Sequence, residues 1–179
     1  MYIPVILGTA REGRQSEKVA RYLLKEAKNA GLDSEIIDVR DYRIMATDKT
    51  ITLPQAKAAL PKIDSADGFI IVSPEYNHGY PGELKMFLDM FYAQWAKKPV
   101  GIAGVSISFM GGGRMVEQLR QVAVELHMHS IREALYFTFV QDLFDDKGEM
   151  KDPASFRDRL KAFFDELIWY AQTLKAVRK

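Results

Sequence analysis

The chain of 179 residues contains no cysteine, and its charges nearly balance. Without cysteine there can be no disulfide, no thiolate nucleophile and no sulfur-ligated metal, which suits a cytoplasmic protein. The 25 basic and 24 acidic side chains give a net charge of +1. This balance argues against a nucleic-acid binder, which concentrates basic charge, and against an acidic electron carrier that docks on basic partners.

Long hydrophobic runs are also missing, so we expect no membrane-spanning segment. Residues 1–13 are apolar over only a few positions and have no charged leader, so we do not expect a signal peptide. Apolar residues make up 47% of the chain and charged residues 27%, an ordinary globular balance. The length fits one domain, and we expect a single domain over residues 1–179.

Short apolar runs alternate along the chain with longer segments of helical period. The apolar runs predict strands at residues 2–8, 34–39, 68–73, 100–106 and 131–140. The periodic segments predict helices at residues 16–30, 54–64 (limited by Pro61), 83–95, 113–126 and 153–177, the last with Asp152 as its N-cap. Residues 40–52 are expected to be irregular. This alternation predicts an α/β domain with a parallel sheet covered by helices on both faces.

Ligands of such sheets bind beyond the carboxyl ends of the strands, at the point where the strand order reverses. Three loops would lie there, at residues 8–16, 74–82 and 106–114. Glycine, asparagine, arginine and hydroxyl side chains gather in the same three loops. The sequence therefore predicts a binding site at this edge of the sheet.

The first loop leads into a helix, whose free backbone N–H groups and partial positive charge favour an anion. Thr9 and Ser16 add hydroxyl groups, and Arg11 and Arg14 add cationic ones. We interpret the loop as a phosphate site because both arginines fall within it. The alternative is a solvated turn in which Ser16 is a plain N-cap.

Two common nucleotide motifs do not fit this loop. There is no G-x-G-x-x-G, so the dinucleotide fingerprint is absent. Gly8 and Gly13 have the spacing of a P-loop, but Arg14 and Gln15 replace its lysine and hydroxyl residue. ATP and GTP are therefore not expected.

The second loop, residues 74–82, contains two prolines, two glycines and two tyrosines. A rigid turn with exposed aromatic rings could hold a flat ligand by its face, whereas the alternative is a plain connector. His78 could act as a general acid or base, but a lone loop histidine more often faces solvent or makes a hydrogen bond. His127 and His129 complete the histidines, and none belongs to a carboxylate motif with metal-ligand spacing, so no metal site is expected.

The third loop carries three successive glycines, Gly111, Gly112 and Gly113, before a helix. Glycines allow a close backbone approach to a ligand, and the helix start would favour an anion. The alternative is a flexible loop without a ligand.

At these three loops the sequence resembles the NADPH-dependent FMN reductase family, which includes quinone, azo-dye and chromate reductases. The resemblance covers nearly the whole chain and rests on three segments in order: GTAREGRQSEKVARYL, SPEYNHGYPGELKMFLD and GGGRMVEQLRQV. It implies a flavodoxin-like three-layer sandwich with five parallel strands in the order 2-1-3-4-5.

The resemblance also implies which residues bind the cofactor. Thr9, Arg11, Gln15 and Ser16 would hold the FMN phosphate. Pro74, Glu75, Tyr76 and Asn77 would line the isoalloxazine ring with His78 close by, and Ser106 and residues 111–113 would face its other edge. The charge at the third helix start would then favour an anionic reduced flavin. Two positions depart from the family pattern: Thr9 replaces serine but keeps the hydroxyl, and Ser108-Phe109 replaces a glycine pair, so that Phe109 could narrow the space over the flavin.

The implied activity is an FMN-dependent NADPH oxidoreductase with a ping-pong reaction. NADPH would give a hydride to flavin N5 and leave, and a small acceptor would then take the electrons in the same space. Quinones, free flavins, azo compounds and metal oxyanions are all candidates for the acceptor. The preference for NADPH comes from the family, and Arg14 or Arg114 could meet its 2′-phosphate.

Residues 83–95 are apolar on more than one face of the predicted helix. Such a helix must be covered on both sides, and we favour a second subunit as the second cover. The family's dimers and tetramers agree with this. The alternative is a broad core helix covered by the last helix of the same chain.

Two other functions remain possible for this fold. A flavodoxin-type carrier would bind FMN without oxidising NADPH, and a regulatory module would bind no cofactor. The near-neutral charge and residues 74–77 argue against the electron carrier. The first loop, residues 8–16, argues against a module without a cofactor.

Overall fold

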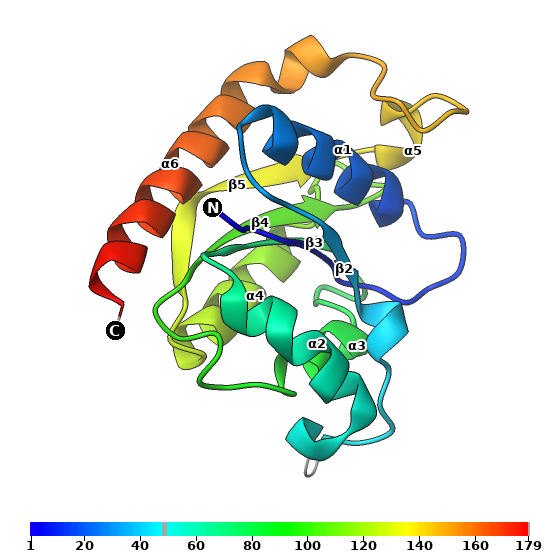
Figure 1. The fold of residues 1–179 in the computed structure, drawn as a ribbon. Coiled ribbons are helices and arrows are strands. Elements are labelled where there is room, and N and C mark those ends of the chain that lie inside the picture. The colour runs from blue at the N-terminus through cyan, green and yellow to red at the C-terminus, as the bar shows by residue number, and fades with distance from the viewer. Residues whose placement is uncertain (48–49, 179) are drawn as a thin grey trace.

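The computed structural model describes residues 1–47 and 50–178 and contains one five-stranded parallel sheet (Figure 1). The strands lie in the order β2-β1-β3-β4-β5. This confirms the predicted α/β class and the predicted strand order. The strands are β1 (Val5–Leu7), β2 (Ile36–Asp38), β3 (Phe69–Pro74), β4 (Pro99–Val105) and β5 (His129–Phe137).

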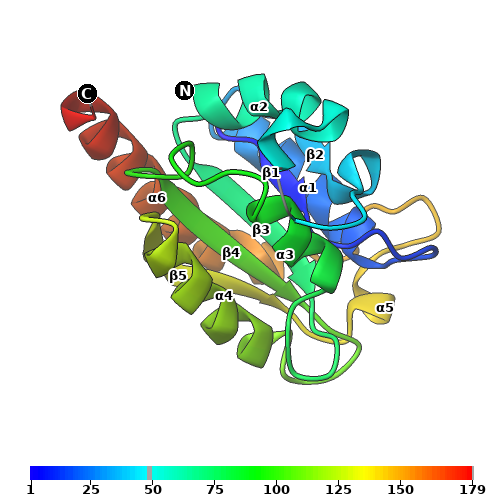
Figure 2. The same ribbon diagram turned by 90° about the horizontal axis from the view of Figure 1, so that it is seen from below.

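Helices cover both faces of the sheet, as Figures 1 and 2 show. One face packs against α1 (Ser16–Asn29) and α6 (Arg157–Val177). The other packs against α2 (Pro54–Ser65), α3 (Gly82–Leu88) and α4 (Gly113–Glu125). The remaining elements are short: η1 (Val39–Tyr42), η2 (Thr50–Thr52), α5 (Val140–Leu143) and η3 (Pro153–Phe156).

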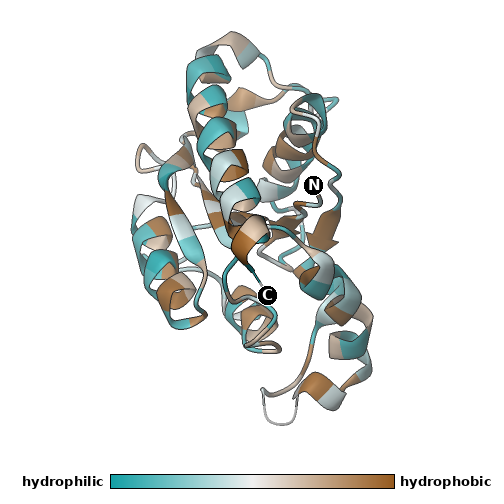
Figure 3. Cartoon of the chain, turned by 60° about the vertical axis from the view of Figure 1, so that its left-hand side comes forward, coloured by the Kyte–Doolittle hydropathy of each residue, from teal (hydrophilic) through white to brown (hydrophobic). Residues whose placement is uncertain are grey.

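The central strands form because their residues can be buried on both faces at once. All seven residues of β4 are buried, as is β3 apart from its last residue, Pro74. Parallel strands with helices on both sides have continuous apolar sequences of this kind. The covering helices are amphipathic instead, and Figure 3 shows hydrophilic and hydrophobic residues alternating along α6.

The helix predicted over residues 83–95 ends at Leu88, so the second half of that prediction is wrong. The chain turns after Leu88, and the indole N–H of Trp95 donates to the Leu88 carbonyl at 2.9 Å. A continuing helix would have used that carbonyl for its own ladder. The turn buries these apolar side chains inside the same chain: Leu84, Phe87, Leu88, Met90, Phe91 and Trp95. The pattern that favoured a second subunit is therefore explained largely within one chain.

Other boundaries differ by smaller amounts. The last strand ends at Phe137, and residues 140–143 form α5. The last helical segment begins with η3, where the Asp152 carboxylate caps the backbone N–H of Ser155 as predicted. The segment expected to be irregular contains η1 and η2, and its residues 48–49 lie outside the described residues. Within residues 1–47 and 50–178, no helix has the length and apolar character needed to cross a membrane.

Candidate active site

A cavity of about 340 Å³ opens at the carboxyl ends of β1, β3 and β4. Its position is the predicted one, because the strand order reverses between β1 and β3. All three predicted loops contribute to its wall. The lining residues are Arg11, Glu12, Gly13, Arg14, Gln15, Ser16, Pro74, Glu75, Tyr76, Val105, Ser106, Ile107 and Val140.

The start of α1 presents unpaired polar groups to this cavity. Gln15 occupies the N-cap position but makes no side-chain cap. In the part of the chain that the structure describes, no group accepts a hydrogen bond from the backbone N–H groups of residues 12–16. The Ser16 hydroxyl and the Gln15 Oε1 atom are both buried without a partner among those residues. The Ser16 hydroxyl and the N–H groups can donate, so they suit a ligand with anionic oxygens, whereas the Gln15 Oε1 atom is an acceptor and would need a donor.

The same observation bears on the two interpretations of Ser16. A plain N-cap would use its hydroxyl on the first turn of the helix. Ser16 is instead the first helical residue, and its hydroxyl makes no bond within the described chain. Ser16 is therefore not a plain N-cap in this structure, and its contact with a phosphate stays a prediction.

Thr9 lies behind the cavity wall and is fully buried. Its hydroxyl donates to Glu83 Oε1 at 3.0 Å, and the Ala10 N–H donates to the same oxygen at 2.9 Å. Burial alone would raise the pKa of the Glu83 carboxyl, but these hydrogen bonds hold that pKa below its ordinary value. Thr9 therefore fastens the first loop to α3, while its contact with a phosphate stays a prediction.

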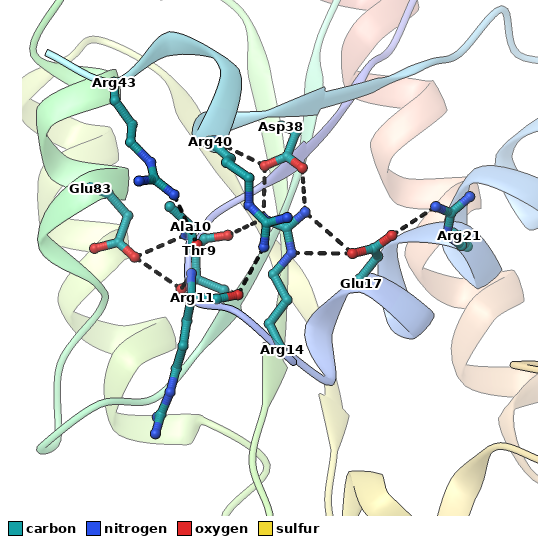
Figure 4. A network of polar contacts seen from close by, with 10 residues as sticks. All are labelled: Thr9, Ala10, Arg11, Arg14, Glu17, Arg21, Asp38, Arg40, Arg43 and Glu83. Atoms are coloured by element: carbon teal, nitrogen blue, oxygen red, sulfur yellow. Dashed lines mark hydrogen bonds and ion pairs between the residues drawn. The ribbon is translucent and has the colours of Figure 1, made fainter. Parts of the chain in front are cut away.

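Arg14 borders the cavity, but its guanidinium is bound to other protein groups (Figure 4). The side chain is 3% exposed and forms a two-pronged ion pair with Asp38, with Nη1 at 2.8 Å from Oδ1. It also contacts Glu17 and donates to the Thr9 carbonyl. Burial alone would raise the pKa of the Asp38 carboxyl, but Arg14 and the Arg40 N–H lower it. This structure thus places Arg14 where it supports the loop.

Arg11 connects the first loop with the second. It is exposed at the cavity edge, and its guanidinium lies 5.4 Å from the centre of the Tyr76 ring. A cation at this distance is attracted to the face of the ring. Arg11 thus remains available to an anion, as the sequence predicts.

Only the first part of the second loop, up to Tyr76, belongs to the cavity wall. Pro74, Glu75 and Tyr76 line the cavity. Asn77 and His78 lie outside the lining, exposed at the tip of a tight turn with φ values of 50° and 68°. Backbone hydrogen bonds between Tyr76 and Gly79 close this turn. Asn77 and His78 do not line the cavity, and their contact with a cofactor stays a prediction.

Glu75 meets the start of α4. Its carboxylate accepts from the backbone N–H of Arg114 at 3.2 Å and from the Arg114 guanidinium at 3.1 Å. A carboxylate at a helix start satisfies its free N–H groups and its partial charge. The anion that the sequence places at this helix start is therefore supplied, in this structure, by the chain itself.

The third loop contributes Ser106 and Ile107 to the cavity, but not its three glycines. Gly111 and Gly112 have φ values of 57° and 83°, which favour glycine. A Cβ atom on Gly112 would lie 2.9 Å from the Gly104 Cα atom. These two glycines, with Gly113, pack the loop against β4 and β5, and their contact with a cofactor stays a prediction.

Phe109 is 72% exposed and lies outside the lining, so it does not narrow this cavity. Ile107, two residues earlier, occupies the wall instead.

Sequence reasoning missed two groups of residues. Val105, Ile107 and Val140 give the cavity its apolar wall. Asp38 and Glu83 hold the first loop from outside. A signal existed for Asp38, because it ends the strand next to β1 and pairs in register with Leu7. Among the described residues, no group of three or more histidine, aspartate or glutamate side chains could hold a metal ion.

Residues 1–142 match the family described as NADPH-dependent FMN reductase. A Schizosaccharomyces pombe NAD(P)H-dependent FMN reductase is 36% identical over 136 residues, covering 70% of this chain and 67% of the relative. A Pseudomonas putida quinone reductase is 30% identical over 183 residues, covering 98% of this chain and 97% of the relative.

Solved structures agree on the fold. FerB from Paracoccus denitrificans, a flavoenzyme NAD(P)H:(acceptor) oxidoreductase, superposes with a TM-score of 0.79 at 18% identity, covering 96% of this chain and 97% of FerB. A mutant flavodoxin from Pseudomonas aeruginosa superposes with a TM-score of 0.60 at 19% identity, covering 93% and 99%. The flavodoxin-like fold is thereby confirmed. The family match and the extent of the relatives together show that this chain belongs to the NADPH-dependent FMN reductase family of oxidoreductases.

Proposed function

We propose that the cavity holds FMN, and that the protein uses it to pass electrons from NADPH to small acceptors, quinones first among them. The observation that carries this proposal is the unpaired start of α1, with the partnerless Ser16 hydroxyl and the open N–H groups of residues 12–16. The family match supports FMN as the ligand. The quinone reductases among the relatives support a quinone as acceptor.

The phosphate and the ring of the cofactor would contact different parts of the cavity. Ser16, Gln15 and the open N–H groups would hold the phosphate, with Arg11 adding charge at the edge. Pro74, Tyr76 and Ser106 would lie against the ring, beside the apolar wall of Val105, Ile107 and Val140. When bound, FMN supplies two-electron chemistry, since its ring takes up a hydride and gives electrons to a second substrate.

No side chain needs to act as a nucleophile in this reaction. The protein's part is to bind, to orient and to exclude water from one side of the ring. We propose NADPH as the preferred donor because the family is described by it. Arg114 is the better candidate for the 2′-phosphate: it pairs with Glu75, but its side chain is 44% exposed, whereas the Arg14 side chain is 3% exposed and pairs with Asp38 and Glu17.

A ping-pong order predicts parallel lines when reciprocal initial velocity is plotted against reciprocal NADPH concentration at several benzoquinone concentrations. NADP⁺, the oxidised product of NADPH, must leave before the quinone enters the same space. NADH in place of NADPH provides the matched comparison and should give a lower kcat/KM. Lines that intersect would mean that both substrates are bound together, and the proposed order would then be wrong.

The remaining features are also proposals. A single domain over residues 1–179 is supported by one continuous sheet with helices on both faces. A homodimer or homotetramer is supported by exposed apolar side chains near the cavity mouth: Ile107, Phe109 and Phe139. Sedimentation as a monomer at micromolar concentration would contradict it. A cytoplasmic location is supported by the absence of cysteine.

A further inference from the structure

Three consecutive carbonyl groups of the first loop each accept a hydrogen bond from a different arginine (Figure 4). We call residues 8–16 the phosphate loop. The Thr9 carbonyl accepts from Arg14 Nη1. The Ala10 carbonyl accepts from Arg43 Nη2 at 3.2 Å, and the Arg11 carbonyl accepts from Arg40 Nη2 at 3.0 Å.

The three arginines are organised by the end of β2. Asp38, its last residue, pairs with the Arg14 guanidinium and accepts from the Arg40 backbone N–H at 3.0 Å. Arg40 lies within η1, and Arg43 is the first residue after the end of η1. Because Asp38 lies beside Leu7 in the sheet, this segment reaches the phosphate loop just after the end of β1.

We infer that Arg14, Arg40 and Arg43 are positioning residues that hold the carbonyl side of the phosphate loop, so that its N–H groups stay open to the phosphate of FMN. This inference rests on the proposed function. The held carbonyls belong to residues 9–11, and the open N–H groups belong to residues 12–16. A carbonyl turned into the cavity would repel a phosphate, and three fixed carbonyls prevent that turn.

The contacts have two physical effects on binding. A loop fixed before the ligand arrives loses less conformational entropy on binding. A guanidinium on a carbonyl also polarises the peptide group. The Arg11 carbonyl belongs to the same peptide group as the Glu12 N–H, which is the first of the open donors.

Single ion pairs or hydrogen bonds of exposed arginines usually contribute little to stability. Here two such contacts, from Arg40 and Arg43, and the contact of the buried Arg14 fall on three consecutive residues of one loop that borders the cavity. The effect should therefore appear in the affinity for the phosphate group and not in the stability of the fold.

The test compares FMN with riboflavin, which has the same ring but no phosphate. The double variant Arg40→Gln, Arg43→Gln is suitable because Arg43 is exposed and Arg40 is half-buried, with its Nε atom buried but without a partner in the described chain, so the fold should be kept. Flavin-free protein is titrated with each flavin, and quenching of flavin fluorescence gives the two Kd values. We expect the Kd for FMN to rise about tenfold and the Kd for riboflavin to change less than about twofold.

Two further variants serve as rescue and control. Arg43→Lys keeps one donor for the Ala10 carbonyl and should bind FMN nearly as the wild type does. Arg21→Gln removes an arginine that pairs with Glu17 from the same helix and is 70% exposed, and should change neither Kd.

The outcomes separate the inference from the proposed function. An equal loss of affinity for both flavins, or an unchanged Kd for FMN, would overturn the positioning role. Wild-type protein that binds FMN no better than riboflavin would overturn the proposed phosphate site, and the inference with it.

Discussion

Replacing Ser16 by alanine is expected to weaken FMN binding and, in the same protein without flavin, to increase the free energy of unfolding. Ser16 is 2% exposed and its buried hydroxyl has no partner in the described chain, so the hydroxyl costs stability as long as no ligand is bound. Removing it should raise the free energy of unfolding by ~1 kcal/mol. The Kd for FMN should rise roughly 10- to 100-fold, because a hydrogen bond to a charged group is lost. Urea denaturation and flavin titration measure the two quantities.

Ser34 provides the matched control. It is also buried, at 5% exposed, but its hydroxyl donates to the Ile3 carbonyl at 2.7 Å. Ser34→Ala should therefore lower the free energy of unfolding by ~1 kcal/mol and leave FMN affinity unchanged. If both alanine variants lose stability equally and bind FMN alike, then Ser16 is an ordinary structural serine and the phosphate site is misplaced.

Replacing Gly104 by alanine is expected to destabilise the protein more than any surface change. A Cβ atom there would lie 2.4 Å from the Gly111 carbonyl oxygen and 3.1 Å from a Val116 methyl group. The first clash involves backbone, so the loop leading to α4 must move as a whole. We expect a loss of ~3 kcal/mol, typical of severe overpacking. For a domain of this size that corresponds to a fall in Tm of roughly 6–12 °C, measurable by calorimetry.

Gly82→Ala is the control for this variant. Gly82 is the first residue of α3, and nothing lies within 4 Å of the position its Cβ would take. Alanine there should leave stability unchanged or raise it by ~0.5 kcal/mol, since glycine costs more backbone entropy. If the Gly104→Ala and Gly82→Ala proteins have the same Tm, β4 does not pack as closely against the loop as described, and the prediction is contradicted.

The fold was accessible from the sequence because its strands are buried on both faces. A run such as residues 69–72 is apolar throughout, and such runs alternate with helical periods. The region after Leu88 was not accessible in this way. Its apolar residues fit a helix as well as a turn, and only the hydrogen bond from Trp95 to Leu88 decides between them.

The position of the site could be predicted from the sequence, whereas the hydrogen-bond partner of each side chain could not. Loops after neighbouring parallel strands must meet, so Ser16, Tyr76 and Ser106 come together as predicted. The sequence could not indicate that Glu83, far along the chain, binds the Thr9 hydroxyl.

The same limit applies to charged groups and glycines. Arginine is a residue type that often binds phosphate, but Asp38 at the end of β2 binds the Arg14 guanidinium. Gly111 and Gly112 have the flexibility that a ligand could need, yet the close approach they permit is to Gly104 and Tyr136 of the chain itself. Such pairings depend on three-dimensional packing between segments distant in sequence.

The most direct test of the central claim is a visible absorption spectrum of the purified protein, recorded before and after NADPH is added without oxygen. We expect the bands of oxidised flavin, which bleach with NADPH and return when a benzoquinone is added. Flavin bands that persist in NADPH would contradict the enzyme function and favour an electron carrier reduced by a partner. Protein that neither contains flavin nor binds added FMN would contradict the assignment of the cavity itself.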